Sequence, residues 1–244
     1  MMYGAATDIG RVRKVNEDNY IVHETGPFPY IIVADGMGGH NAGEKASLMA
    51  IETISEELTK NLKEEFNYVE AGEVVRRSFL EANSSIYTYS KNNYKVMGMG
   101  TTATLAMFHS GKVITAHVGD SRAYLISDKA IKQITKDHSY VQELVTRGEI
   151  TEEQAKHHPN KNYITRAMGA EEALKVDIGI RPYNGEIILL CSDGLTNMVD
   201  DEEILKIMNS SKDLQKNAET LVRMANDAGG NDNITVVALE RKKI

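Results

Sequence analysis

Four aspartates in this sequence each stand at the end of an apolar strand, beside a glycine or within two residues of one, and this repetition constrains the fold most. The longest example is the stretch from Tyr30 to His40, where a run rich in β-branched residues predicts a buried strand that stops at Asp35 and three glycines. Independent turns would account for one or two such aspartates. Four of them predict carboxylates that converge at one rim of a sheet: Asp35, Asp120, Asp193 and Asp232.

Such a cluster of acids needs positive charge, because like charges repel and an unpaired carboxylate away from water costs several kcal/mol. Nearby arginines such as Arg13 and Arg122 can neutralise part of this negative charge. Divalent cations explain the remainder better than lysines do. A site made only of oxygen ligands favours Mg²⁺ or Mn²⁺ over zinc.

Hydrophobic periodicity predicts both strands and helices along the chain. Apolar residues recur on one helical face over 43–62, 69–91 and 214–228, and a further helix is expected near Asp200. Strands are expected within 3–24, at 186–191 and at 234–240, and as a three-stranded antiparallel meander at 101–108, 112–118 and 122–127. Capping boxes at Ser139 and Thr151 predict two short helices joined near Gly148.

Length and charge limit the classes of protein that this chain can belong to. The 244 residues suit a single domain, 1–244, and the net charge of -7 argues against nucleic acid as a partner. The one cysteine, Cys191, lies in an apolar run and is expected to be a buried, inert thiol. Because no signal-like N-terminus and no apolar run of ~20 residues is present, we expect a soluble, cytoplasmic protein without a membrane segment.

Two other patterns have weaker functional interpretations. Residues 98–103 match a Gly-x-Gly-x-x-Ala dinucleotide fingerprint, but a helix precedes them and a strand follows, which is the reverse of the required context. His157 and His158 could bind a metal, although no acidic or cysteine partner is near them in the sequence. The break in β pattern there favours a flap at about 145–165 instead.

Seven short motifs, taken in order, resemble the PP2C class (PPM) of metal-dependent protein serine/threonine phosphatases, especially the compact bacterial type. The resemblance covers nearly the whole chain. The motifs are Arg13-x-x-Asn16-Glu17-Asp18, Asp35-Gly36-Met37-Gly38-Gly39, Gly98-Met99-Gly100-Thr101-Thr102, Gly119-Asp120-Ser121-Arg122, Asp137-His138-Ser139, Ser192-Asp193-Gly194 and Asp232-Asn233-Ile234-Thr235.

The resemblance implies an α+β fold, a four-layer αββα sandwich of two antiparallel sheets flanked by helices. It implies two Mn²⁺ or Mg²⁺ ions, or three. Asp35 would bridge two of them and the Gly36 carbonyl would bind one, while Asp193 and Asp232 complete the other shell. Asp120 with Asp193 would hold the third ion. Glu17 and Asp18 would act directly or through bound water, and Arg13 would bind the substrate phosphate.

By the same resemblance, a hydroxide that bridges the metals would attack the phosphorus of phosphoserine or phosphothreonine on proteins without a covalent phosphoenzyme. The family's histidine after Asp-Gly, a general acid in eukaryotic members, is replaced by Met37, so His40 is the candidate proton donor. A partner serine/threonine kinase and a monomeric state are also implied.

Other classes of function can be compared with the residues. A cysteine phosphatase needs histidine before its nucleophile and arginine six residues after it, whereas Leu190 and Asn197 flank Cys191 in those places. A haloacid-dehalogenase-type phosphatase needs Asp-x-Asp, which the chain lacks. A catalytically inactive phosphoprotein-binding module would have lost a metal aspartate, and all of them are present.

Overall fold

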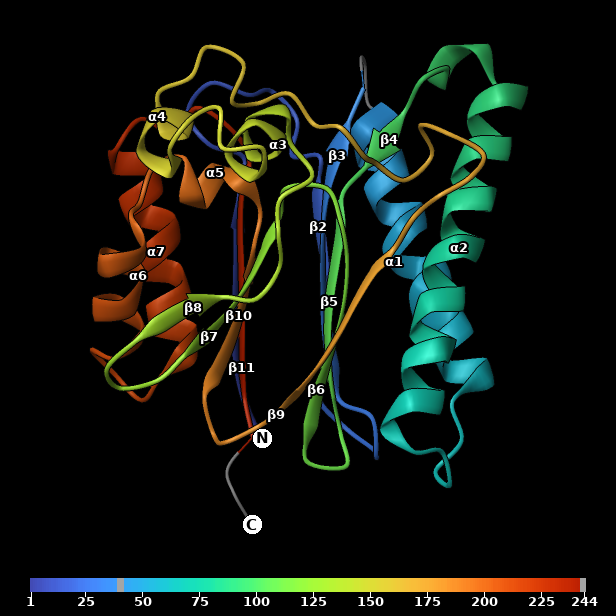
Figure 1. Cartoon of the computed structure of the whole chain (residues 1–244), viewed down its shortest axis with the longest axis horizontal. Helices are drawn as coiled ribbons and strands as arrows, with labels where there is room; N and C mark the ends of the chain where they lie inside the picture. Colours follow the sequence, from blue (N-terminus) through green and yellow to red (C-terminus); the bar gives the residue numbers. More distant parts are fainter. Residues whose placement is uncertain (39–41, 242–244) are drawn as a thin grey trace.

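Two antiparallel β-sheets lie face to face at the centre of the molecule (Figure 1). The structure, a computed structural model, describes residues 1–38 and 42–241. The first sheet has the order β1 (Met2–Asp8), β11 (Ile234–Glu240), β10 (Ile187–Cys191), β7 (Arg122–Ile126) and β8 (Ile131–Gln133). The second has the order β2 (Asp18–His23), β3 (Tyr30–Met37), β5 (Ala103–His109), β6 (Lys112–Val118) and β9 (Asp177–Pro182), and β4 (Gly100–Thr101) pairs with β3.

Helices cover the outer face of each sheet, which gives four layers (Figure 1). The long helices α1 (Ala42–Asn61) and α2 (Tyr68–Asn92) lie on the second sheet, and α6 (Asp201–Met208) and α7 (Leu214–Asp227) lie on the first. Short helices complete the chain: η1 (Tyr94–Val96), α3 (Tyr140–Thr146), α4 (Glu152–Lys156) and α5 (Asp193–Thr196). Within the described ranges, none of the helices combines the length and the hydrophobicity that crossing a membrane requires.

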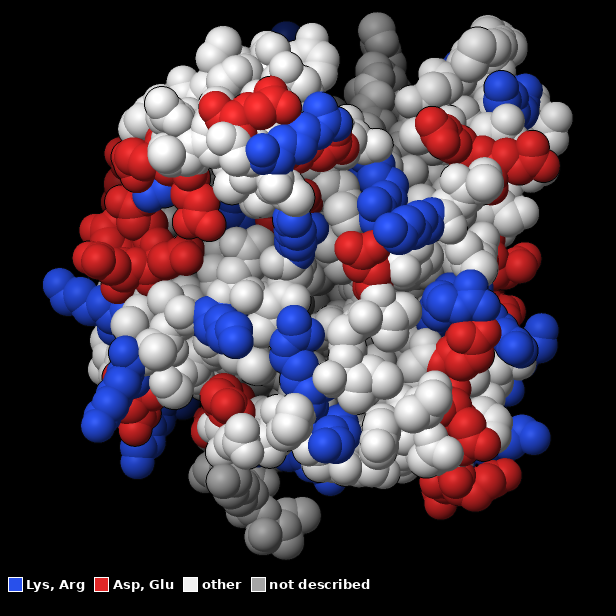
Figure 2. Space-filling model, in the orientation of Figure 1, with Lys and Arg blue, Asp and Glu red and all other residues white. Residues whose placement is uncertain are grey.

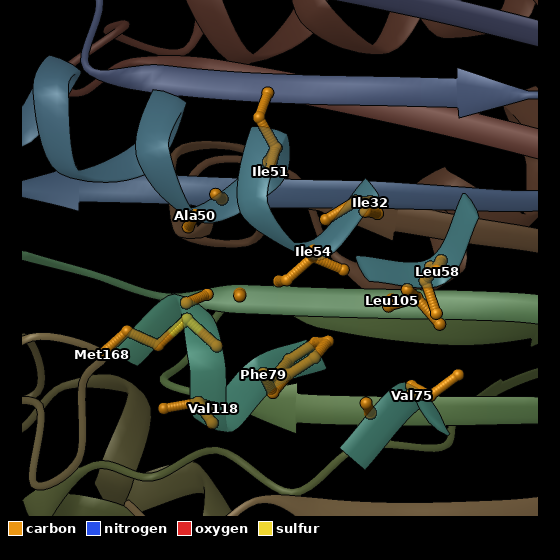
Figure 3. Packing of buried hydrophobic residues seen from close by; sticks show 14 of the residues in the cluster. Ile32, Ala50, Ile51, Ile54, Leu58, Val75, Phe79, Leu105, Val118 and Met168 are labelled. Carbon is orange, nitrogen blue, oxygen red and sulfur yellow. The ribbon is translucent and has the colours of Figure 1, made fainter. Parts of the chain in front are cut away.

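Three apolar clusters hold these layers together. One joins α1 and α2 to the second sheet, and Figure 3 shows Ile54, Leu58 and Phe79 of the helices packed toward Ile32 and Leu105 of the strands. A second cluster joins α6 and α7 to the first sheet, and a third fills the space between the sheets. The expectation of a four-layer sandwich is therefore confirmed.

The apolar run of strand β3 is continuous because both faces of the strand lie in apolar clusters. Its side chains alternate between the two faces of the sheet. Ile32 and Ala34 belong to the cluster under the helices, whereas Ile31 and Val33 belong to the cluster between the sheets. Because both faces are covered, every position in the run is buried.

Polar side chains cap the starts of α2, α3 and α4. Asn67 caps α2 through a capping box with Glu70, and Thr151 forms the predicted box with Gln154 at the start of α4. Ser139 caps α3 by accepting a hydrogen bond from the backbone N–H of Gln142 at 3.3 Å, but the Gln142 side chain does not bond back to Ser139, so the predicted box is only half formed. Gly148, at φ +73°, makes the turn between the two short helices.

Two expectations about strands are wrong. The segment 101–127 is not a three-stranded meander, because β7 leaves its neighbour β6 and joins the other sheet beside β10. Strand β3 does not stop at Asp35, because Gly36 and Met37 pair with the short strand β4. The sequence reading also missed β8 and β9, whose residues are only partly buried or exposed.

Figure 2 shows the charge on the face seen in Figure 1. Basic and acidic side chains are interspersed over most of it, and an acidic group lies on the left, where α6 begins with Asp201, Glu202 and Glu203. The face therefore presents patches of both signs rather than one continuous field.

Candidate metal centre

Asp18 and Asp35 face each other on neighbouring strands of the second sheet, as Cα partners in the β2–β3 ladder. The Oδ2 atom of Asp18 accepts a hydrogen bond from Ser192 Oγ at 2.7 Å, which ties it to the first sheet. Burial raises the pKa of Asp18 to about 7, although hydrogen bonding opposes the rise. Burial also raises the pKa of Asp35 well above its ordinary value, and the charge of Asp18 adds to this.

Asp193 and Asp232 come from the first sheet. Asp193 is the first residue of α5, just after β10, and Asp232 precedes β11. Asn197 Nδ2 donates to Asp193 Oδ2 at 3.0 Å, and the Arg13 guanidinium donates to Asp232 Oδ2 at 2.6 Å. Burial raises the pKa of Asp193 to about 6, and the charge of Asp232 adds to the rise.

Asp120 occupies the corner where the chain passes from one sheet to the other, between β6 and β7. Gly119, at φ +108°, makes that corner, and its backbone N–H donates to His138 Nδ1 at 3.0 Å. Burial raises the pKa of Asp120 to about 8, and the charge of Asp193 contributes. The rim on which the aspartates converge thus belongs to both sheets rather than to one.

These five carboxylates form one electrostatic unit, which we call the aspartate centre. The raised pKa of Asp35 has contributions from the charges of all the others. Groups with strongly raised pKa values, such as Asp35, gather at functional sites more often than elsewhere. The members of the aspartate centre are Asp18, Asp35, Asp120, Asp193 and Asp232.

The centre has more negative charge than its own surroundings neutralise. Asp18 Oδ1 and Asp120 Oδ1 are buried and have no hydrogen-bond partner. Arg122, which the sequence suggested as a neutralising cation, donates from Nε and Nη2 to Asp137 Oδ2 at 2.9 and 2.7 Å. Its charge still opposes the rise that burial causes in the pKa of Asp120 and of Asp193. In the described part of the chain, Arg13 is the cation that pairs directly with the centre. Buried oxygens without partners fit a divalent cation, which neutralises them without needing a proton.

The carboxylates of the aspartate centre, all of them described residues, do not form a preformed cluster of three metal ligands. Among the described residues, no three histidine, cysteine or acidic side chains already surround a single point as a closed metal site. Mg²⁺ and similar cations commonly keep several waters and take only one or two carboxylates directly. Carboxylates that do not yet form a closed cluster are therefore compatible with metal binding.

Glu17 and Gly36 lie where α1 begins. The Gly36 N–H donates to the Glu17 carbonyl at 3.1 Å, and a Cβ atom on Gly36 would overlap the carbonyl of Gly43. Burial raises the pKa of Glu17, whereas hydrogen bonding to the backbone of Gly43 and Glu44 lowers it. Glycine is thus required at position 36 because the first turn of α1 packs against that backbone.

Arg13 lies in the connection between β1 and β2, with 49% of its side chain exposed. The hydrogen bond to Asp232 raises its pKa, and its other guanidinium donors remain accessible to a ligand. His40, the candidate proton donor, lies outside the described residues. Met37, which stands where the family histidine is expected, is part of β3.

The segment predicted as a flap contains α4 and the connections on either side of it. It is attached to α3 by the Tyr140 N–H, which donates to the Tyr163 carbonyl at 2.8 Å. His157 is 80% exposed and lies 3.4 Å from Glu153, so the expectation that it has no acidic neighbour is wrong. His158 Nδ1 accepts from the Asn160 N–H. These contacts are those of a surface segment rather than of a metal site.

Two residues beside the aspartate centre, Ser192 and Asn233, belong to the sequence motifs, but the sequence analysis assigned them no role. Ser192 links the sheets, because its Oγ donates to Asp18 and accepts from the Thr235 N–H at 2.9 Å. Asn233 is buried and bonds to the segment that carries Arg13 and Glu17. Their position beside candidate metal ligands was the only signal for them in the sequence.

A family sequence model and a curated relative both match nearly the whole of this chain. The sequence model of the family described as Protein phosphatase 2C matches residues 10–235. The serine/threonine phosphatase stp of Listeria monocytogenes is 43% identical over 240 residues, which cover 96% of this chain and 94% of that protein.

Solved structures share the fold. The serine/threonine phosphatase PstP/Ppp of Mycobacterium tuberculosis has a TM-score of 0.89 at 34% identity, covering 99% of this chain and 98% of that one. The catalytic domain of PstP in complex with two manganese ions has a TM-score of 0.83 at 35% identity, with 97% of this chain and 96% of that one covered.

Proposed function

Because this chain belongs to the protein phosphatase 2C family and is a metal-dependent protein serine/threonine phosphatase, we propose that the aspartate centre is where it hydrolyses phosphoserine and phosphothreonine on proteins. The observation that carries the proposal is the set of buried and half-buried carboxylates from both sheets, two of which have buried oxygens without a partner.

Each candidate ligand has a place in this proposal. Asp35 and the Gly36 carbonyl would hold one Mn²⁺ or Mg²⁺ ion, and Asp35, Asp193 and Asp232 a second. Asp120 and Asp193 would hold a third ion. Glu17 and Asp18 would hold bound waters or contact the cations directly. When bound, such ions neutralise the carboxylates and lower the pKa of a coordinated water toward neutrality, which supplies a nucleophile for phosphorus.

Arg13 would bind the phosphate group of the substrate. Its guanidinium already lies at the edge of the centre, on Asp232, and about half of the side chain is exposed. A planar guanidinium donates two parallel hydrogen bonds to phosphate oxygens, so Arg13 can orient the phosphate over the carboxylates. The same contact would stabilise negative charge on these oxygens as the ester bond breaks.

The flap at 145–165 would contact the protein part of the substrate. It lies at the same end of the sandwich as α5, which begins with Asp193 (Figure 1). Replacing it with the corresponding segment of a relative should change the preference among phosphopeptides, and an unchanged preference would contradict this role. We further propose a monomeric, cytoplasmic enzyme that opposes a serine/threonine kinase.

Hydrolysis of a phosphothreonine peptide tests the proposed function. Chelated wild-type protein, Asp193→Asn and the control Asp213→Asn would each be titrated with Mn²⁺. Asp213 caps α7, and asparagine preserves that cap. We expect metal-dependent turnover by wild type and Asp213→Asn and a loss of at least about 100-fold in Asp193→Asn. Turnover by stripped protein, or none with any divalent metal, would favour a phosphoprotein-binding module instead.

A further inference from the structure

The connection between β1 and β2, residues 9–17, is fastened to the start of β11 by one buried side chain. Asn233 is only 4% exposed. Its Nδ2 donates to the carbonyls of Ile9 at 2.9 Å and Val15 at 3.0 Å, and its Oδ1 accepts from the Glu17 N–H at 2.9 Å. The amide therefore uses both donor hydrogens and its acceptor on a single loop.

Backbone contacts support the same junction. The Arg11 N–H donates to the Gly230 carbonyl at 2.7 Å. Gly10, at φ +84°, lies so close to the backbone of Asp232 that a Cβ atom would overlap its carbonyl. The loop at 229–233 and the loop at 9–17 consequently form one packed unit.

Arg13 lies between the points that Asn233 holds. Ile9 is four residues before it and Val15 is two residues after it, so both arms of the loop are fixed while its tip remains exposed. An arginine that binds phosphate by two parallel hydrogen bonds needs its Cα atom fixed, because its side chain has several rotatable bonds whose entropy is lost on binding.

We propose that Asn233 is a positioning residue for phosphate recognition, which holds the loop 9–17 so that the Arg13 guanidinium is directed at the phosphate group of the substrate. Asn233 does not touch the substrate, and the inference rests on the proposed function of Arg13. Its role is separate from that of its neighbour Asp232, a candidate metal ligand.

Asn233→Ala tests this positioning, with Arg13→Ala as the benchmark. We expect both variants to lower kcat/KM for a phosphothreonine peptide about tenfold or more, through a higher KM because a binding contact is lost and a lower kcat because charge stabilisation is lost. If Asn233 acts through Arg13, the double variant will be no worse than Arg13→Ala alone. KM effects that multiply in the double variant would overturn the proposal.

A matched control separates positioning from stability. Asn217, in α7, is another buried asparagine. Its Nδ2 donates to the carbonyls of Met208 at 3.0 Å and Ser211 at 2.8 Å, which precede α7. Asn217→Ala should lower the melting temperature by an amount similar to that of Asn233→Ala and leave KM unchanged. An equal rise of KM in both variants would show that lost stability, not loop position, is responsible.

Two measurements are independent of turnover. In metal-free protein, amide exchange at Glu17 and across 9–17 should accelerate in Asn233→Ala and not in Asn217→Ala. Mn²⁺ affinity, measured by calorimetry, should be unchanged; a weaker Mn²⁺ affinity with unchanged KM would assign Asn233 to the metal ligands instead.

Folding and activity failures can also be distinguished. If Asn233→Ala does not fold, Asn233→Ser replaces it, because the serine hydroxyl can reach at most one of the two carbonyls. We expect Asn233→Ser to raise KM by less than Arg13→Ala does. An unchanged KM in Asn233→Ser would contradict the proposal. Wild-type protein without turnover would refute the proposed function, and unchanged exchange at 9–17 in the variant would refute the fastening itself.

Discussion

Replacing Asp120 with asparagine should stabilise the metal-free protein, although Asp120 is a candidate metal ligand. Burial raises the pKa of Asp120 to about 8, and its Oδ1 has no partner. An acid with a raised folded-state pKa holds its proton more tightly when folded. Its cost to stability is therefore absent below the unfolded pKa, ~4, and grows as the pH rises through the folded pKa.

The size of the effect follows from that pKa. At pH 7 the solution lies about three pH units above the unfolded pKa, and each unit corresponds to ~1.4 kcal/mol, so the ceiling is ~4 kcal/mol. Asparagine removes the charge but places an amide in the same buried position, and burying that amide offsets part of the gain in the free energy of unfolding. We expect Asp120→Asn to raise the free energy of unfolding by ~1–2 kcal/mol at pH 8 and by less at pH 5.

Urea denaturation of chelated protein at pH 5 and pH 8 measures this difference. Asp177→Asn is the opposite control: burial favours a higher pKa for Asp177, but hydrogen bonding to His138 and the charge of Arg166 lower it below its ordinary value. It should therefore be destabilising at pH 8. A loss of stability in metal-free Asp120→Asn, or an equal gain at both pH values, would refute the reasoning.

Three further predictions concern neighbouring positions and the metal itself. Gly36→Ala should lose ~2–3 kcal/mol in a thermal melt, because α1 would have to shift, whereas Gly26→Ala, in open space, should lose only ~1 kcal/mol from backbone strain; equal losses would contradict this. Ser192→Ala removes a hydrogen bond that lowers the pKa of Asp18, so calorimetric Mn²⁺ affinity should fall at pH 6.5 and recover by about pH 8.5. Removal of Mn²⁺ should lower the melting temperature more at pH 8 than at pH 6, and a pH-independent change would count against carboxylate ligands.

The sequence predicted the long elements well because their burial is regular. Helices α1, α2 and α7 each bury one stripe, and β3 is buried on both faces, so periodicity alone identifies them. The strand β9 contains only two large apolar residues, Ile178 and Ile180, which leaves a weak pattern. Its pairing with β6 is a tertiary interaction that no local signal encodes.

The passage of β7 into the other sheet could not be predicted for a related reason. Gly119-Asp120-Ser121 is compatible both with a hairpin turn and with a corner between sheets. Contacts far away in the sequence decide the outcome: the His138 N–H donates to the Gly119 carbonyl at 2.7 Å, and β10 pairs with β7. Tertiary packing also decides that Arg122 forms its hydrogen bonds with Asp137 and not with a carboxylate of the aspartate centre.

The aspartates themselves were identified from the sequence because each follows or precedes an apolar run that had to be a strand. Ser192, which holds Asp18, and Asn233, which holds the loop 9–17, were not identified. Ser192 and Asn233 act through hydrogen bonds to residues more than 170 positions away, Asp18 and Glu17 among them. Such contacts exist only once both sheets have assembled.

Anomalous diffraction from crystals grown with Mn²⁺ tests the central claim most directly, because it locates the cations without relying on activity. We predict manganese peaks within about 2.0–2.6 Å of oxygens of Asp35, Asp193 and Asp232 and of the Gly36 carbonyl. Peaks elsewhere on the molecule, with the aspartate centre free of manganese at saturating concentration, would contradict the account.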